Sequence, residues 1–139
     1  MSYNIYIAGS FSNEQEKKDI YSLIEKVRKI HPNAELFIPM EHFVEGGNEK
    51  DNKGNYIMSN QEWGRRVYEM DINALNQANE VIAIYRGRIS GTGTAFEIGY
   101  AVAKGIPVTV YVPDNVDITS CMVMNGATIV ISNKINEQK

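Results

Sequence analysis

VIAIYRGRISGTGTAFEIGYAVAKG, residues 81–105, is the stretch that decides the fold. Its first five residues form an apolar run that is typical of a buried strand. A turn rich in Gly and Thr follows, and a helical pattern over residues 94–104 ends at Lys104-Gly105. In an open α/β sheet, ligands bind at such a turn, beyond the carboxyl end of a strand. Glu97, in the first turn of the predicted helix, is therefore well placed to meet a ligand.

The same alternation of strand and helix patterns extends outward along the chain. Further apolar runs predict strands over residues 5–8, 34–38, 107–112 and 127–131, and helical periodicity predicts helices after Ser12, over 63–78 and within 118–131. This order predicts an α/β fold, a doubly wound Rossmann- or flavodoxin-like sheet of about five mainly parallel strands with helices on both faces. With 139 residues, the chain is expected to form one domain over 1–139.

Two predicted helices have distinctive local patterns. In the first, Ser12 and Gln15 match a capping box. An apolar stripe follows it, comprising Ile20, Leu23, Ile24, Val27 and Ile30. In the helix over 63–78, Asp71 lies beside the apolar stripe, where it is either an exposed edge residue or a carboxylate of a site.

Composition excludes several classes of protein. The net charge of -3 argues against a general nucleic-acid binder, which normally has a basic face. Cys121 is the one cysteine, so no intrachain disulfide can form, and we expect it to be a small buried residue. No apolar run is long enough to span a membrane, and no signal peptide is recognisable, so a cytoplasmic location is expected. Residues 44–60 are polar and glycine-rich, and form either a lid or a solvated insertion.

The Gly/Thr turn fits neither a dinucleotide fingerprint nor a Walker A loop, since the required glycine spacing and Gly-Lys-Ser/Thr are missing. It is either a cradle for a phosphate or sugar, or a tight turn in which Thr94 caps the helix and pairs with Glu97 in a capping box. As a site residue, Glu97 would be a nucleophile or base, and Asp71 the second carboxylate that such chemistry needs. His31 and His42 have no partners at metal-ligand spacing, so neither a metal nor a cofactor is expected.

Taken together, three segments resemble the nucleoside 2-deoxyribosyltransferase family. They are residues 5–11 (IYIAGSF), the pair Trp63 and Asp71, and residues 93–101 (GTAFEIGYA). The resemblance implies that Glu97 attacks the anomeric carbon of deoxyribose, that Tyr6 orients it and that Asp71 lies in the site. It also implies a homodimer or higher homo-oligomer in which a neighbouring subunit completes each pocket.

Two departures point to a sister branch, the 2'-deoxynucleoside 5'-monophosphate N-glycosidases. Gly91 stands where the transferases carry an aspartate, and Ser120-Cys121-Met122 replaces their Asn-x-Met segment. In that branch serines bind the 5'-phosphate, a role open here to Ser10, Ser90 and Ser120. Arg86 and Arg88 would add positive charge or are solvated loop residues. The substrate-binding residues implied are Gly9, Ser10, Phe11, His42, Trp63, Ser90, Gly91, Gly93, Thr94, Ser120 and Met122.

The hypothesis is an enzyme that cleaves the N-glycosidic bond of 2'-deoxynucleosides or their 5'-monophosphates and passes the sugar to water or to another nucleobase. The alternative is a non-catalytic nucleotide-binding module, or a phosphoribohydrolase, because the Gly-Thr-x-x-Glu pattern also resembles those proteins. The set of Tyr6, Asp71 and Glu97 favours the enzyme, since a sensor has no need of it. The expected partners are small nucleosides, nucleotides and nucleobases, with no nucleic-acid polymer and no membrane.

Overall fold

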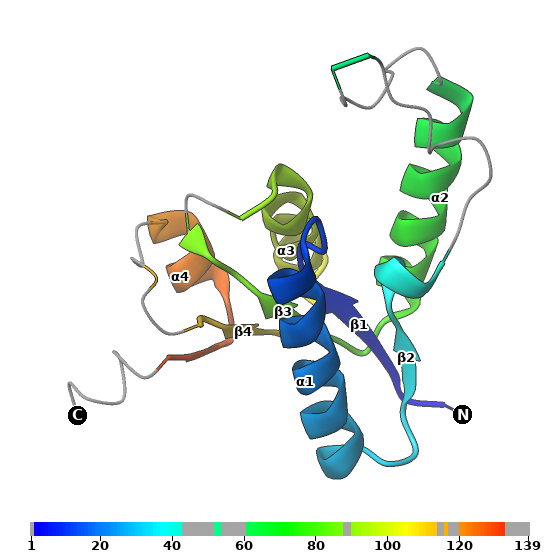
Figure 1. Cartoon of the computed structure of the whole chain (residues 1–139). Coiled ribbons are helices and arrows are strands. Elements are labelled where there is room, and N and C mark those ends of the chain that lie inside the picture. Colours follow the sequence, from blue (N-terminus) through cyan, green and yellow to red (C-terminus); the bar gives the residue numbers. More distant parts are fainter. Residues whose placement is uncertain are drawn as a thin grey trace.

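The computed structural model describes residues 2–42, 52–53, 61–87, 90–113, 116 and 120–132. Within them, one parallel five-stranded sheet has the order β2-β1-β3-β4-β5 (Figure 1). The strands are β1 (Asn4–Ala8), β2 (Glu35–Phe37), β3 (Glu80–Ile84), β4 (Val108–Tyr111) and β5 (Ile129–Ile131). The helices are α1 (Glu14–Ile30), the short 3-10 helix η1 (Pro39–Glu41), α2 (Gln61–Gln77), α3 (Thr92–Ala103) and α4 (Cys121–Gly126).

Helices cover both faces of the sheet, as the sequence predicts. Alternate residues of a strand point to opposite faces, so β1 divides its side chains between two apolar cores. Ile5 and Ile7 pack with the apolar stripe of α1, whereas Tyr6 and Ala8 join the core under α2, α3 and α4. In Figure 1, α1 lies on one side of the sheet, α3 and α4 lie on the other, and α2 extends beyond the strands at the β2 side.

The strand order creates a switch point between β1 and β3. The chain leaves β1 toward β2 on one side, and leaves β3 toward β4 on the other. The loops that follow β1 and β3 therefore diverge at the carboxyl edge of the sheet and leave a crevice, where ligands bind in doubly wound folds. Residues 9–13 form the first loop, and the described residues 85–87, 90 and 91 belong to the second.

The starts of α1 and α3 differ from the predictions, whereas the end of α3 agrees with its prediction. Asn13, not Ser12, caps α1, because its extended backbone lets Oδ1 accept the Glu16 amide at 2.9 Å. Helix α3 begins at Thr92 after Gly91 and has no side-chain cap, so the predicted Thr94–Glu97 capping box is wrong. The predicted stop at Lys104-Gly105 is confirmed, since Gly105 adopts a left-handed φ of 74° beyond the end of α3.

Two burial predictions are also wrong. Ile30 continues the apolar periodicity of α1 but is 63% exposed, because the last turn of α1 runs past the strands (Figure 1). Cys121 is exposed because it is the first residue of α4, where the short helix has only Val123 buried. Of the predicted loop over 44–60, the structure describes residues 52 and 53 alone, and Arg88 also lies outside the described residues. In the described ranges, no helix is long and apolar enough to cross a membrane.

The two ends of the α1 stripe provide a matched test of this packing. Ile20 is 2% exposed and Ile30 is 63% exposed, and both are isoleucines of one helix. Ile20→Ala should lower the free energy of unfolding by about 2–5 kcal/mol, because it leaves a cavity between α1 and the sheet. Ile30→Ala should change it by less than about 0.5 kcal/mol. Urea unfolding measures both, and equal losses would contradict the described packing.

Candidate active site

Three polar groups are buried together on the α2–α3 side of the sheet. Tyr6 is at the centre of β1 and is fully buried, Glu97 lies on α3, and Asp71 lies on α2. The Tyr6 hydroxyl, Glu97 Oε2 and Asp71 Oδ1 have no hydrogen-bond partner of normal geometry among the described residues. Unpaired buried polar atoms of this kind are costly to a fold, and they gather at sites that meet a ligand.

Burial makes both carboxyl groups weak acids, and the nearby Asp71 charge weakens Glu97 further. Loss of solvation raises the pKa of Glu97 to about 7; the nearby Tyr6 hydroxyl lowers it, and Asp71 raises it further. Loss of solvation likewise raises the pKa of Asp71 to about 6, against a smaller lowering by His42. Because the two groups repel each other, they titrate as a pair that carries about one proton near neutral pH.

Tyr6 remains a phenol at any physiological pH. Its pKa lies far above the ordinary value, chiefly because it is buried and also because Glu97 and Asp71 repel a phenolate. The hydroxyl therefore keeps its proton and can donate a hydrogen bond to the Glu97 carboxylate, which explains why Tyr6 lowers the pKa of Glu97. Its position in a central strand fixes the ring.

A row of stacked rings leads from Tyr6 to His42. Tyr6 and Phe37 are cross-strand partners of β1 and β2, so their rings lie on one face and stack with centroids 5.3 Å apart. Phe37 in turn stacks on His42, just after η1, at 4.3 Å. This places His42 on the Asp71 side of the site, which is consistent with its lowering of the Asp71 pKa. Phe37 was not predicted as a site residue, because its role depends on the β1–β2 register.

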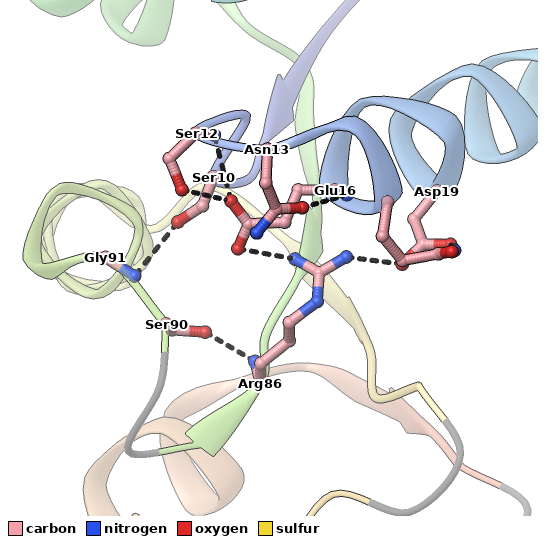
Figure 2. Close-up of polar contacts among 9 residues, drawn as sticks. Ser10, Ser12, Asn13, Glu16, Asp19, Arg86, Ser90 and Gly91 are labelled. Carbon is pink, nitrogen blue, oxygen red and sulfur yellow. Dashed lines mark hydrogen bonds and ion pairs between the residues drawn. The ribbon is translucent and has the colours of Figure 1, made fainter.

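A second group of predicted residues meets across the switch point (Figure 2). Ser10 Oγ, from the loop after β1, accepts the Gly91 amide at 2.9 Å. Ser90 Oγ accepts the Arg86 amide within the loop after β3. A Cβ on Gly91 would lie 2.7 Å from Ser10 Oγ, so a side chain at position 91 would displace the Ser10 hydroxyl from this contact. Ser10, Ser90 and Gly91 are thus brought together.

Arg86 is neither a solvated loop residue nor a free positive charge. It is 8% exposed, and its guanidinium binds Asp19 Oδ2 at 2.6 Å and approaches Glu16 Oε2 at 3.8 Å. Both carboxylates belong to α1 (Figure 2). No local pattern around Arg86 reveals these partners, because Asp19 is 67 positions away in the sequence.

The other predicted site residues are spread around these two groups. Gly93 lies near the pair, since a Cβ there would be 4.0 Å from Glu97 Oε1. Thr94 is buried in the first turn of α3, and Gly9 packs beside Ile20. The remaining four are half-exposed Phe11 after β1, partly buried Trp63 early in α2, and Ser120 and exposed Met122 at the start of α4. Ser120 Oγ accepts the Val123 amide within α4 and is not joined to Ser10 or Ser90 by a hydrogen bond among the described residues, and no group of His, Cys, Asp and Glu in the described segments could hold a metal ion.

A family model for nucleoside 2-deoxyribosyltransferase matches residues 5–133. The chain belongs to this family. The protein is thus an enzyme of deoxyribosyl transfer or N-glycosidic cleavage, with small nucleosides and nucleobases as its class of substrate, and the prediction of a non-catalytic module is set aside. A comparison with curated proteins finds no match.

Solved structures share the fold over nearly the whole chain. A 2-deoxyribosyltransferase from Bacillus psychrosaccharolyticus has a TM-score of 0.73 at 21% identity, with 98% of this chain and 90% of that one covered. A conserved protein from Enterococcus faecalis V583 has a TM-score of 0.70 at 18% identity, covering 99% and 95%. The CMP N-glycosidase BcmB from Clostridium botulinum has a TM-score of 0.55 at 19% identity, covering 97% and 94%.

The raised pKa of Glu97 predicts a pH-dependent gain in stability on its removal. The pKa rises from 4.5 to about 7 on folding, so the ionised group destabilises the fold above pH 7 and has no effect below pH 4.5. Glu97→Gln should therefore raise the free energy of unfolding at pH 8 by on the order of 2–3 kcal/mol and leave it nearly unchanged at pH 4.5. Thermal melts at both pH values test this, with exposed Glu25→Gln as the control. A pH-independent difference would contradict the burial of this carboxylate.

Proposed function

We propose that the protein cleaves the N-glycosidic bond of 2'-deoxynucleoside 5'-monophosphates through a covalent deoxyribosyl–Glu97 intermediate. The observation that carries the proposal is the buried pair of Glu97 and Asp71 beside the Tyr6 hydroxyl. Two carboxyl groups that share about one proton near neutral pH supply both a nucleophile and an acid, which is what glycosidic cleavage requires.

In the first step, a Glu97 carboxylate oxygen attacks C1' of the deoxyribose. The bond from C1' to the base nitrogen breaks, its electron pair leaves with the base, and the proton on Asp71 neutralises the departing base. Tyr6, which stays protonated, orients Glu97 through its hydroxyl. In the second step, water or another base attacks C1' and releases Glu97 as a carboxylate. Asp71 takes up the proton that the attacking molecule loses.

The pKa directions set the expected pH dependence of the reaction. Below about pH 6 the pair takes up a second proton, so Glu97 has no free nucleophilic oxygen. Above about pH 7 the pair loses its last proton, so Asp71 has none to give to the base. Base release should thus follow a bell-shaped profile with its maximum near pH 6–7.

The polar groups at the switch point support a 5'-monophosphate as the substrate. Ser10 and Ser90 each accept a backbone amide, so each hydroxyl proton stays available to donate to an anionic oxygen. The first-turn amides of α3 have no side-chain cap and attract an anion. Thr92, the first residue of α3, and Glu97 are five residues apart, about 7.5 Å along the helix axis, so one helix can reach both ends of a sugar phosphate.

Position 91 gives independent support for this substrate. A carboxylate there would repel a phosphate, and any side chain at position 91 would have to displace the Ser10 hydroxyl that is proposed to bind it. The proposal extends to a homo-oligomer with shared sites, for which exposed apolar side chains such as Tyr68, Phe96 and Met122 offer contact area. The cytoplasmic location remains a prediction.

Chromatography of the purified protein with deoxynucleosides and their 5'-monophosphates, each with and without a second free base, tests the reaction. We expect base release from monophosphates without an acceptor, and its loss in Glu97→Gln. Mass spectrometry of the rapidly quenched wild type should find one deoxyribose phosphate attached, and none on the variant. Normal base release by Glu97→Gln would sink the mechanism. A new nucleoside formed only with acceptor would make the protein a transferase.

The phosphate role of Ser10 predicts a selective loss of affinity. Ser10→Ala removes one hydroxyl donor, so KM for the monophosphate should rise about 10-fold, which is what a hydrogen bond to a charged group is worth. KM for the matching nucleoside should change less than about 3-fold. Ser22→Ala, which changes an exposed serine of α1 outside both loops, is the control variant. An equal change in both KM values would contradict the phosphate role.

A further inference from the structure

The loops that flank the crevice are tied together by a buried ion cluster of Arg86, Glu16 and Asp19 (Figure 2). Arg86 follows β3, whereas Glu16 and Asp19 lie in the first turns of α1, so the cluster joins elements on either side of the switch point. Glu16 Oε1 also accepts the Ser12 amide at 2.9 Å and the Ser12 hydroxyl at 2.5 Å. The cluster thus reaches the loop after β1.

Stability alone is a poor explanation for this cluster. Two carboxylates face one guanidinium, and Arg86 and Glu16 are each 8% exposed. Burying charges removes their solvation, and such clusters are often no more stable than apolar replacements. In addition, Nη1 of Arg86 has no hydrogen-bond partner in the part of the chain that the structure describes. The cluster is better explained by the fixed arrangement that it gives to the loops after β1 and β3.

The cluster holds the two loops that carry the groups proposed to bind the 5'-phosphate. The Arg86 side chain binds α1, and its amide donates to Ser90 Oγ. On the other side of the same crevice, Ser10 Oγ accepts the Gly91 amide, in a contact so close that a Cβ on Gly91 would clash. The Arg86 backbone amide thus binds Ser90, and the Arg86 side chain holds the start of the same loop against α1. Glu16 links the cluster to Ser12, which lies in the loop that carries Ser10.

We propose that Arg86 is a positioning residue for substrate binding, which holds the loops after β1 and β3 so that Ser10, Ser90 and the α3 N-terminus face one phosphate. The proposal rests on the proposed function. Arg86 touches no substrate in this role, because Glu16 and Asp19 already occupy its guanidinium. It acts on affinity and not on the chemical step, since Tyr6, Asp71 and Glu97 lie on other elements.

The decisive test separates KM from kcat in Arg86→Met. KM for the 5'-monophosphate should rise about 10-fold, while kcat and the KM of the nucleoside each change less than about 3-fold. Arg86→Lys, which can reach one carboxylate, should restore part of the affinity. Arg65→Met is the matched control, because Arg65 also binds two carboxylates, Glu62 and Glu69, but on the exposed surface of α2. A parallel fall in kcat for both substrates, or unchanged KM in a folded Arg86 variant, would overturn the proposal.

Arg86→Met leaves the buried Glu16 carboxylate and the partly buried Asp19 carboxylate without their cation, and could unfold the protein. The triple variant Glu16→Gln/Asp19→Asn/Arg86→Met removes that charge, so it should keep a melting temperature near that of the wild type and still show the rise in KM. Wild-type KM in the folded triple variant would overturn the positioning role.

Hydrogen exchange keeps the two proposals apart. Amides of residues 10–12 and 91–93 should exchange faster in Arg86→Met than in Arg65→Met, whether or not the protein releases a base. If the wild type is inactive on every substrate, the proposed function fails, and the exchange result alone decides whether Arg86 holds the two loops together. Unchanged exchange of these amides in Arg86→Met would overturn the positioning role of Arg86.

Discussion

The withdrawal of Glu97 and Asp71 from water is the constraint on which this structure depends. An ionised carboxylate is less stable in such a place than in solvent, and the raised pKa of each group measures that cost. The surrounding apolar core offsets it, with Tyr6 in β1, Leu75 in α2 and Ile98 in α3 all nearly or fully buried. The same desolvation that weakens the fold keeps about one proton on the pair near neutral pH, which is the protonation state that the proposed mechanism needs.

Strand order then determines which element carries each group of the site. Because β1 lies between β2 and β3, Tyr6 contacts Phe37 on one side and is in register with Val81 on the other. The central strand thus carries the group that is proposed to orient Glu97. The loops after β1 and β3 bring the serine hydroxyls to the start of α3, and the same helix carries Glu97, so the proposed nucleophile and the proposed phosphate-binding groups lie along one helix.

Local sequence patterns predicted the elements well and their ends less well. The 81–85 run, the Gly/Thr turn and the Lys104-Gly105 stop predicted a strand, a turn and a helix, and all three are confirmed within a residue or two at each end. Ser12 and Thr94 were wrong as caps because the cap is chosen by backbone conformation, which Asn13 and Gly91 adopt. Ile30 was wrong as a core residue because periodicity does not tell where the sheet beneath a helix ends.

By itself, the sequence determined the α/β class, the parallel sheet and the family, since periodicity and short motifs are local properties of the chain. It also placed Tyr6, Asp71 and Glu97 on a strand and two helices. The tertiary structure alone decided that these groups share one buried site, that Phe37 stacks between Tyr6 and His42, and that Arg86 is held by α1. Those contacts join residues far apart in the chain, and only strand order, register and helix packing set the distances between them.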